Sequence, residues 1–339
     1  RILYVNYGKS NLSRRKKQIS SKKKRKKKRV GVRFFKALII CFLLLIVIGA
    51  AGIGIYVKKV IDNTPEVTAK DIMPQGYTTN IVDSNGTLLE QLKDSDSNRV
   101  YKKYDEISPY MGKAFVAIED ERFYKHNGID IQGIIRAGVN GVSHCFHFTE
   151  GASTLTQQLI KNNIFPNFIN ESKYQRIERK IQEQYLALKI EKEMSKEEIL
   201  EAYMNTINLG QGCLGVQTAA QRYFNKDAKD LTLSECAVIA AITQSPSNLN
   251  PVSNPENNAK RRKKVLKNMK EQGFITKDEY DEAMADNVYD RISETASNTT
   301  ASKPYTYFID AVINQVVDDL VTEKSYTETQ AYNLLYSGG

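Results

Sequence analysis

Two glutamates, Glu119 and Glu183, stand in contexts that suit proton transfer or charge stabilisation. Before Glu119, Met111, Phe115 and Ile118 recur at helical spacing, so a helix would bury that stripe and leave the carboxylate at its edge. A carboxylate beside an apolar face is a candidate general acid or base. A solvated acidic helix end is the alternative interpretation.

Glu183 follows a cluster of cations in a second stretch with helical periodicity. Lys180 shares a predicted helix face with Glu183, and Arg179 precedes it by four residues. The opposite, buried stripe is predicted to hold Ile177, Ile181 and Leu188. A surface ion pair between Arg179 and Glu183, worth about 0.2–0.5 kcal/mol, is the alternative to a catalytic role.

The segment GASTLTQQ, residues 151–158, carries hydroxyl and amide side chains at a predicted helix start. Ser153 suits the N-cap position. The polar residues expected together on this helix are Thr154, Gln157, Gln158 and Lys161. A helix N-terminus with hydroxyls, amides and one lysine favours a pyrophosphate or sugar site. A capped amphipathic helix without a ligand is the alternative.

The elements that must position these residues are mostly helical from about residue 108 to 290. Capping boxes are predicted to start helices after Ser195, Thr232 and Thr276, and a further helix begins at Pro255 and ends before Gly273. Residues 80–83 and 87–89 read as two short strands around an Asn-Gly turn. A Ser/Thr-rich linker from 298 leads to a predicted helix over 305–320.

The charge of the chain is uneven. Lys and Arg number 49 against 39 Asp and Glu, yet 16 of the basic residues lie in 1–36, which has no acidic residue. Residues 37–57 follow without a charge, long enough to span a bilayer and longer than the apolar part of a signal peptide. Basic residues before the span predict a cytoplasmic N-terminus. The basic run could bind RNA or anionic lipid, but an orientation signal near lipid headgroups is favoured.

Cysteine and histidine usage leaves two questions open. His144, Cys145 and His147 lie close together, but no fourth zinc ligand is apparent, so no metal site is expected there. Cys236 stands in an apolar run and is predicted to be buried. A disulfide between Cys145 and Cys213 is one alternative to free thiols.

The residues EDERFYKHNGID (119–130) and GASTLTQQ (151–158), in that order and spacing, resemble the peptidoglycan glycosyltransferase domain of class A penicillin-binding proteins. The resemblance covers about residues 106–290. No Ser-x-x-Lys motif with Ser-x-Asn and Lys-Thr-Gly partners can be assembled, so the transpeptidase region that follows in bifunctional members is expected to be missing. The chain is interpreted as a fragment of a longer protein.

The resemblance implies a mainly α, lysozyme-like domain with a small jaw subdomain, preceded by one transmembrane helix and a short β-containing stem. The predicted divisions are a basic cytoplasmic tail (1–36), the membrane helix (37–57), the stem (58–107), the glycosyltransferase domain (108–297) and a linker with the start of a transpeptidase region (298–339). The catalytic domain would lie outside the cytoplasm, on the cell membrane.

The resemblance also implies an inverting polymerisation of lipid II, a disaccharide-pentapeptide on a polyprenyl pyrophosphate. Glu119 matches the general base, and Glu183 matches a second glutamate that assists the leaving pyrophosphate directly or through a Mg or Mn ion. The matching substrate-binding positions are Asp120, Arg122, Arg136, Ser153, Thr154, Gln157, Gln158, Lys161, Arg179, Lys180, Asn250 and Arg261. Expected partners are lipid II, the growing glycan strand, the membrane and division or elongation proteins, without nucleic acid.

Two other classes of function compete with this prediction. A lysozyme-type hydrolase also uses a glutamate in a helical cleft, but it needs neither a membrane span nor the cationic segments. A non-catalytic scaffold would tolerate the loss of Glu119. The presence of both glutamates favours an active enzyme.

Overall fold

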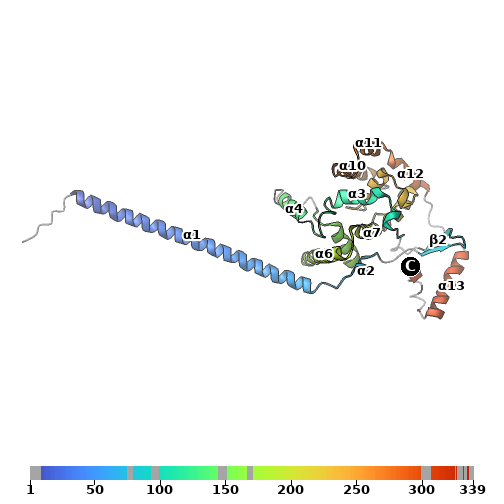
Figure 1. Cartoon of the computed structure of the whole chain (residues 1–339), viewed down its shortest axis with the longest axis horizontal. Helices are drawn as coiled ribbons and strands as arrows, with labels where there is room; N and C mark the ends of the chain where they lie inside the picture. The colour runs from blue at the N-terminus through green and yellow to red at the C-terminus, as the bar shows by residue number, and fades with distance from the viewer. Residues whose placement is uncertain are drawn as a thin grey trace, which may run out of the picture. The chain divides into compact units, whose positions relative to one another are not determined.

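The computed structural model describes residues 9–74, 79–92, 99–143, 151–165, 171–298 and 307–324, together with 326, 331, 334 and 335. The chain divides into two compact units, Arg1–Thr64 and Pro65–Gly339. Helix α1 (Lys9–Asp62) belongs to the first unit and is one continuous helix in Figure 1. Its stretch Phe34–Asp62 is long and apolar enough to cross a membrane. The predicted segment 37–57 lies inside that stretch, and the helix also extends back through the basic residues.

The second unit is built mainly from helices, which confirms the predicted fold class. Its α-helices are α2 (Ala69–Ile72), α3 (Pro109–Glu119), α4 (Ile131–Ser143), α5 (Leu155–Ile164), α6 (Lys173–Glu193), α7 (Lys196–Thr206), α8 (Val216–Phe224), α9 (Leu233–Ala241), α10 (Pro255–Glu271), α11 (Lys277–Ala285), α12 (Val288–Asn298) and α13 (Tyr307–Lys324). Two short 3-10 helices, η1 (Tyr104–Glu106) and η3 (Ala228–Asp230), complete the helical elements described.

The predicted hairpin is present as strands β1 (Thr79–Val82) and β2 (Leu88–Leu92). They pair antiparallel, with Thr79 opposite Leu92, and Gly86 takes the positive φ of +81° that the turn needs. Leu92 packs with α13 in a small core of its own, and β2 and α13 lie together in Figure 1. Val67, Ile72 and Ile107, from the same predicted stem, belong to the main core instead. The predicted domain divisions stay a prediction.

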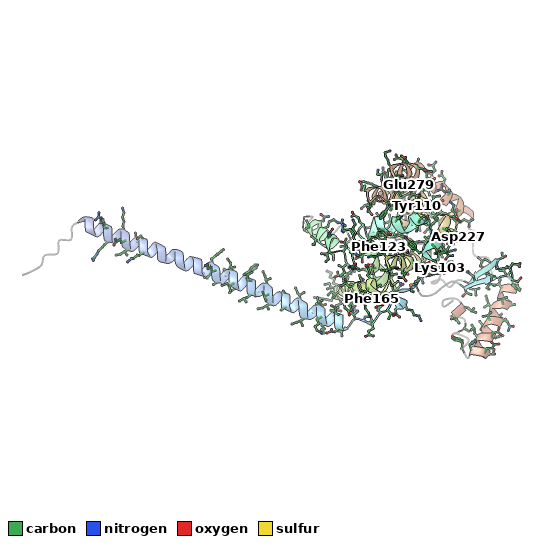
Figure 2. All side chains as sticks on the ribbon, in the orientation of Figure 1. Lys103, Tyr110, Phe123, Phe165, Asp227 and Glu279 are labelled. Atoms are coloured by element: carbon green, nitrogen blue, oxygen red, sulfur yellow. The ribbon has the colours of Figure 1, made fainter. Side chains whose placement is uncertain are left out.

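The main core forms where α3, α9 and α10 pack against one another. All nine residues of α9 are buried, so this helix is the centre of the packing. Phe115 of α3 meets Tyr203 of α7 edge to face, with ring centroids 5.3 Å apart. Tyr110 Oη donates a hydrogen bond to Glu279 Oε1 at 2.9 Å and so joins α3 to α11. Both residues are labelled in Figure 2.

The predicted helix boundaries hold where a cap defines them. Ser195, Thr232 and Thr276 each accept a hydrogen bond from the backbone three residues on, inside complete capping boxes. Pro255 starts α10, and Gly273 follows its end with a φ of +76°. Local side-chain chemistry therefore determines these ends independently of the core.

The predicted buried stripe of α6 is wrong. Ile177 and Leu188 are 53% and 42% exposed, and Ile181 is half-buried. The inward side of α6 instead consists of Arg179, Glu183, Leu186, Ala187 and Ile190. Hydrophobic periodicity selected the other stripe because the buried face of this helix begins with an ion pair rather than with apolar residues.

Candidate active site

A cavity of about 380 Å³ lies at the C-terminal end of α3. Its walls come from the end of α3 and the residues after it, from α4, from the start of α5 and from α10. The lining residues are Ala117, Ile118, Glu119, Asp120, Glu121, Arg136, Gly151, Ser153, Gln158, Gln244, Arg261, Lys264, Asn268 and Gln272. Six of the residues predicted for the site therefore border one cavity: Glu119, Asp120, Arg136, Ser153, Gln158 and Arg261.

Glu119 is the last residue of α3, and three donors surround its carboxylate. Oε1 accepts hydrogen bonds from Thr243 Oγ1 at 2.5 Å and from Arg261 Nη2 at 3.1 Å. Oε2 accepts one from Gln158 Nε2 at 3.1 Å. The side chain is 15% exposed, so the carboxylate is held in one orientation yet remains open to the cavity.

Asp120 directs its carboxylate into the protein, where the side chain is only 2% exposed. Oδ2 accepts a hydrogen bond from the backbone N of Leu155, the first residue of α5, at 2.9 Å. His126 Nε2 lies 2.9 and 3.0 Å from the two carboxylate oxygens. A carboxylate at a helix N-terminus stabilises that end, so this geometry favours a positioning role over the predicted substrate contact.

The two predicted arginines of this region lie in different places. Arg122 forms a bidentate ion pair with Asp130, with N–O distances of 3.0 and 2.5 Å. This pair stabilises the loop between α3 and α4. Arg136 lies on α4 at the cavity, is about half exposed, and has Nη1 3.4 Å from Glu121 Oε2. Of these two arginines, Arg136 is therefore the one positioned to contact a ligand in the cavity.

The start of α5 is capped by Thr154 and not by Ser153, which corrects the sequence prediction. Thr154 Oγ1 accepts from Gln157 N at 3.2 Å and donates to Gly128 O at 2.8 Å. Gln157 Nε2 donates to the same carbonyl at 3.1 Å. Both side chains are buried, so they anchor the loop at Gly128 and do not join the polar face predicted for substrate.

Gly128 is required at that anchor. Its φ is +91°, and a Cβ there would lie 2.5 Å from the backbone oxygen of Ala187 on α6. The loop after Glu119 can therefore approach α6 only with glycine at this position.

The second glutamate, Glu183, is completely buried on α6. Arg179 Nη1 donates to its Oε1, and Lys180 Nζ lies 2.7 Å from its Oε2. Lys180 Nζ also donates to Ser153 Oγ at 3.0 Å, and Ser153 lines the cavity. Arg179 has a second partner, Glu171, 2.7 Å away. The alternative of an exposed surface pair is wrong, because both Glu183 and Arg179 are buried.

Lys161 connects the two carboxylates electrostatically. Burial lowers the pKa of its ammonium group, and the neighbouring charge of Lys180 lowers it further. Glu183 raises the pKa, Arg179 lowers it and Glu119 raises it, so Lys161 lies within range of all four charges. Ser153, which accepts from Lys180 and lines the cavity with Glu119, connects the cation cluster to the general-base candidate.

Asn250 is one of the predicted residues that do not line this cavity. It is 4% exposed, and its Oδ1 accepts hydrogen bonds from Val252 N at 2.9 Å and Ser253 N at 3.1 Å. These contacts close the turn before α10.

Sequence reasoning missed part of the α10 wall and the contact from Thr243. Lys264, Asn268 and Gln272 follow Arg261 at spacings of three, four and four and line the cavity with it. Their helical spacing from Arg261 was a usable signal. Thr243 lies 124 residues from Glu119 in the chain, and no local pattern marks it.

The cysteine and metal predictions have mixed outcomes. His144, Cys145 and His147 lie outside the described residues, so a disulfide to Cys213 stays a prediction. Cys236 is buried as predicted, and burial raises the pKa of its thiol to about 12. Within the described ranges, no group of three or more His, Cys, Asp or Glu side chains could hold a metal ion.

Comparison with known proteins bears on the family of the chain. The transglycosylase family profile matches residues 85–270, which include Glu119, Glu183 and every residue that lines the cavity except Gln272. Penicillin-binding protein 1A of Clostridium perfringens (strain 13 / Type A) is 37% identical over 315 residues, covering 91% of this chain and 45% of that protein. The Streptococcus oralis protein of the same name is 34% identical over 308 residues, covering 91% of this chain and 46% of that protein.

The chain spans less than half the length of these relatives. The profile match nevertheless extends over more than half of the chain. The chain therefore belongs to the transglycosylase family.

Proposed function

We propose that this chain is a membrane-anchored peptidoglycan glycosyltransferase that polymerises lipid II into glycan strands for the cell wall. The observation that carries the proposal is that Glu119 and Ser153 line one cavity, and that Ser153 Oγ accepts a hydrogen bond from Lys180, which is paired with the buried Glu183. A base and a set of cations at one site are what a sugar transfer with a pyrophosphate leaving group requires.

In the proposed reaction, Glu119 removes the proton from the 4-hydroxyl of the acceptor GlcNAc. The hydroxyl oxygen then bonds to the anomeric carbon of the donor MurNAc, on the face opposite the leaving group. The bond from that carbon to the lipid pyrophosphate breaks, the electron pair leaves with the phosphate oxygen, and the configuration inverts. The orientation imposed on Glu119 by Gln158, Thr243 and Arg261 supports this role.

The leaving pyrophosphate gains negative charge, which Lys161, Lys180 and Arg179 would stabilise. Glu183 is fully buried and both of its oxygens face cations. We therefore assign Glu183 an indirect role: it holds Arg179 and Lys180 in place. Arg136 and Ser153 border the cavity and would contact the donor directly.

A Mg or Mn ion near Glu183 stays a prediction. The side chains described around Glu183 fit a protein-held ion poorly, because Arg179 and Lys180 already occupy both carboxylate oxygens. We therefore route no step of the reaction through a metal.

The apolar stretch Phe34–Asp62 supports anchoring in the cell membrane. The basic residues before it favour a cytoplasmic N-terminus and an extracytoplasmic catalytic unit. Cysteine labelling with a reagent that does not cross the membrane, compared between intact and permeabilised cells, tests this orientation. Division or elongation proteins as partners, and the absence of a nucleic-acid partner, stay predictions.

The test of the proposed function is polymerisation of labelled lipid II by the 339-residue chain in detergent micelles. We expect glycan polymer to form, and polyprenyl pyrophosphate to be released in proportion to the glycosidic bonds formed. Sugar hydrolysis without polymer would indicate the hydrolase instead, and no turnover of lipid II by a folded chain would contradict the proposal.

A further inference from the structure

We propose that Thr243 is a positioning residue which, together with Arg261, occupies Glu119 Oε1 and thereby assigns Oε2 as the oxygen that takes the acceptor proton. This inference rests on the proposed function for its chemistry. The hydrogen bonds on which it depends are features of the structure and stand without that function.

Thr243 is well placed to orient a carboxylate from another helix. It follows directly on α9, whose nine residues are all buried, and Ile242 before it is fully buried as well. Helix α9 packs against α3, which ends at Glu119. The partly buried Thr243, in the turn after Ile242, therefore approaches Glu119 from the end of a buried helix.

The two oxygens of Glu119 carry unequal numbers of donors. A carboxylate oxygen offers about two lone-pair sites. Oε1 accepts from Thr243 Oγ1 and Arg261 Nη2, so both of its sites are used. Among the described residues, Oε2 accepts only from Gln158 Nε2. Oε2 thus retains a lone pair, and it belongs to a side chain that lines the cavity.

The Gln158 amide is itself held in orientation. Its Oε1 accepts a hydrogen bond from Tyr203 Oη at 3.3 Å, which directs the NH₂ group toward Glu119. The second lone pair of Oε2 therefore has a defined direction for the incoming proton.

Thr243 has one hydroxyl proton and two acceptors within reach. These are Glu119 Oε1 at 2.5 Å and the backbone oxygen of Ala240 at 3.1 Å. A charged carboxylate is the stronger acceptor, so the proton points to Glu119 before the reaction. Once Oε2 holds the acceptor proton, Glu119 is neutral and Thr243 can turn its proton to Ala240. The hydroxyl can thus respond to the charge of the base and keep a hydrogen-bond acceptor in both states.

Several charged or titratable groups also face Glu119. Thr243 is the better residue to change, because its uncharged hydroxyl can be removed without altering the charge around Glu119. Arg261 approaches from α10, Lys161 from α5 and Tyr203 from α7, and Asp120 adjoins it in the chain. Changing any of these would alter the charge, the core or the helix contacts as well. Thr243→Val removes only a hydroxyl at nearly constant volume.

The direct test is the ¹³C signal of the Glu119 carboxyl group in the full chain, recorded with carboxyl-labelled glutamate at neutral pH and assigned by Glu119→Gln. Removing a hydrogen-bond donor to the carboxylate should shift this signal in Thr243→Val. Thr243→Ser should restore it. Thr218→Val is the matched control, because Thr218 on α8 donates to the backbone oxygens of Leu214 and Gly215, which precede that helix. An unmoved signal in a folded Thr243→Val, or in Thr243→Ala should valine disturb the turn, overturns the proposal.

Lipid II kinetics provide the second readout. Thr243→Val should lower kcat about tenfold with little change in KM, because the lost contact orients the base and not the substrate. A raised KM with normal kcat would overturn the positioning role. If the wild-type chain does not turn over lipid II, the proposed function fails, while the ¹³C signal of the Glu119 carboxyl group still decides whether Thr243 donates to Oε1 as described.

Discussion

The carboxylates of Glu119 and Glu183 differ in exposure and in the charge of their partners. Glu119 is 15% exposed beside a cavity and is held by an alcohol, an amide and one arginine. Glu183 has no exposed surface and is paired with two cations. A buried carboxylate that is fully paired can orient its partners, whereas a partly open one can exchange a proton with a substrate.

The largest effect is expected for Glu119→Gln, because the amide keeps the shape of the side chain but cannot accept a proton. Polymerisation of lipid II should fall by roughly 10²–10⁴-fold. The free energy of unfolding should change by less than about 1 kcal/mol, since the residue is at the cavity edge. Glu271→Gln on α10, an exposed carboxylate, is the control and should leave both unchanged. Activity within tenfold of wild type would remove Glu119 as the base.

Glu183→Gln should reduce both stability and rate. The change removes one counter-charge from the buried Arg179 and takes from Lys180 its carboxylate partner. We expect a loss of about 3 kcal/mol in the free energy of unfolding together with a rate loss of about 100-fold. Urea unfolding and lipid II kinetics measure the two effects.

Glu171→Gln is the matched comparison, because it removes a different carboxylate partner of Arg179 and leaves the Glu183 contacts in place. It should have the smaller effect on both quantities. Normal turnover in Glu183→Gln would show that the buried pair serves stability alone.

Lys161 should give a dependence on pH that distinguishes it from either glutamate. Because its pKa is lowered, chiefly by burial, Lys161 loses its charge at a lower pH than an ordinary lysine. KM for lipid II should therefore rise earlier toward alkaline pH in the wild type than in Lys161→Arg, which stays charged. Lys161→Met should raise KM about tenfold near neutral pH. Parallel alkaline profiles of wild type and Lys161→Arg would argue against a phosphate contact.

The smallest effects should separate two adjacent residues at the start of α5. Ser153→Ala removes the acceptor for Lys180, and we expect a rate loss of about threefold with unchanged stability. Thr154→Ala removes the helix cap and should cost about 1 kcal/mol of unfolding free energy. Thermal melting and initial rates of the two variants test this prediction. A loss of stability in Ser153→Ala, with an unchanged melting temperature in Thr154→Ala, would restore Ser153 as the cap.

The helix ends and the hairpin were predictable because local chemistry determines them. A capping box needs only a hydroxyl and a carboxylate three residues apart, and the Gly86 turn needs only a residue that tolerates positive φ. The buried face of α6 was not predictable in this way. Hydrophobic periodicity assumes that buried residues are apolar, and here Glu183 and Arg179 neutralise each other inside the protein.

The sequence by itself determined the residue types of the site, the helices that carry them and the family to which the chain belongs. Only the tertiary structure decided which of these residues share a cavity, that Asp120 and Gln157 turn inward, and that Thr243 reaches Glu119 across 124 residues of chain. The reason is physical. Spacing along a helix describes neighbours on the same element, whereas the direction of a hydrogen bond between elements depends on how α3, α5, α9 and α10 pack.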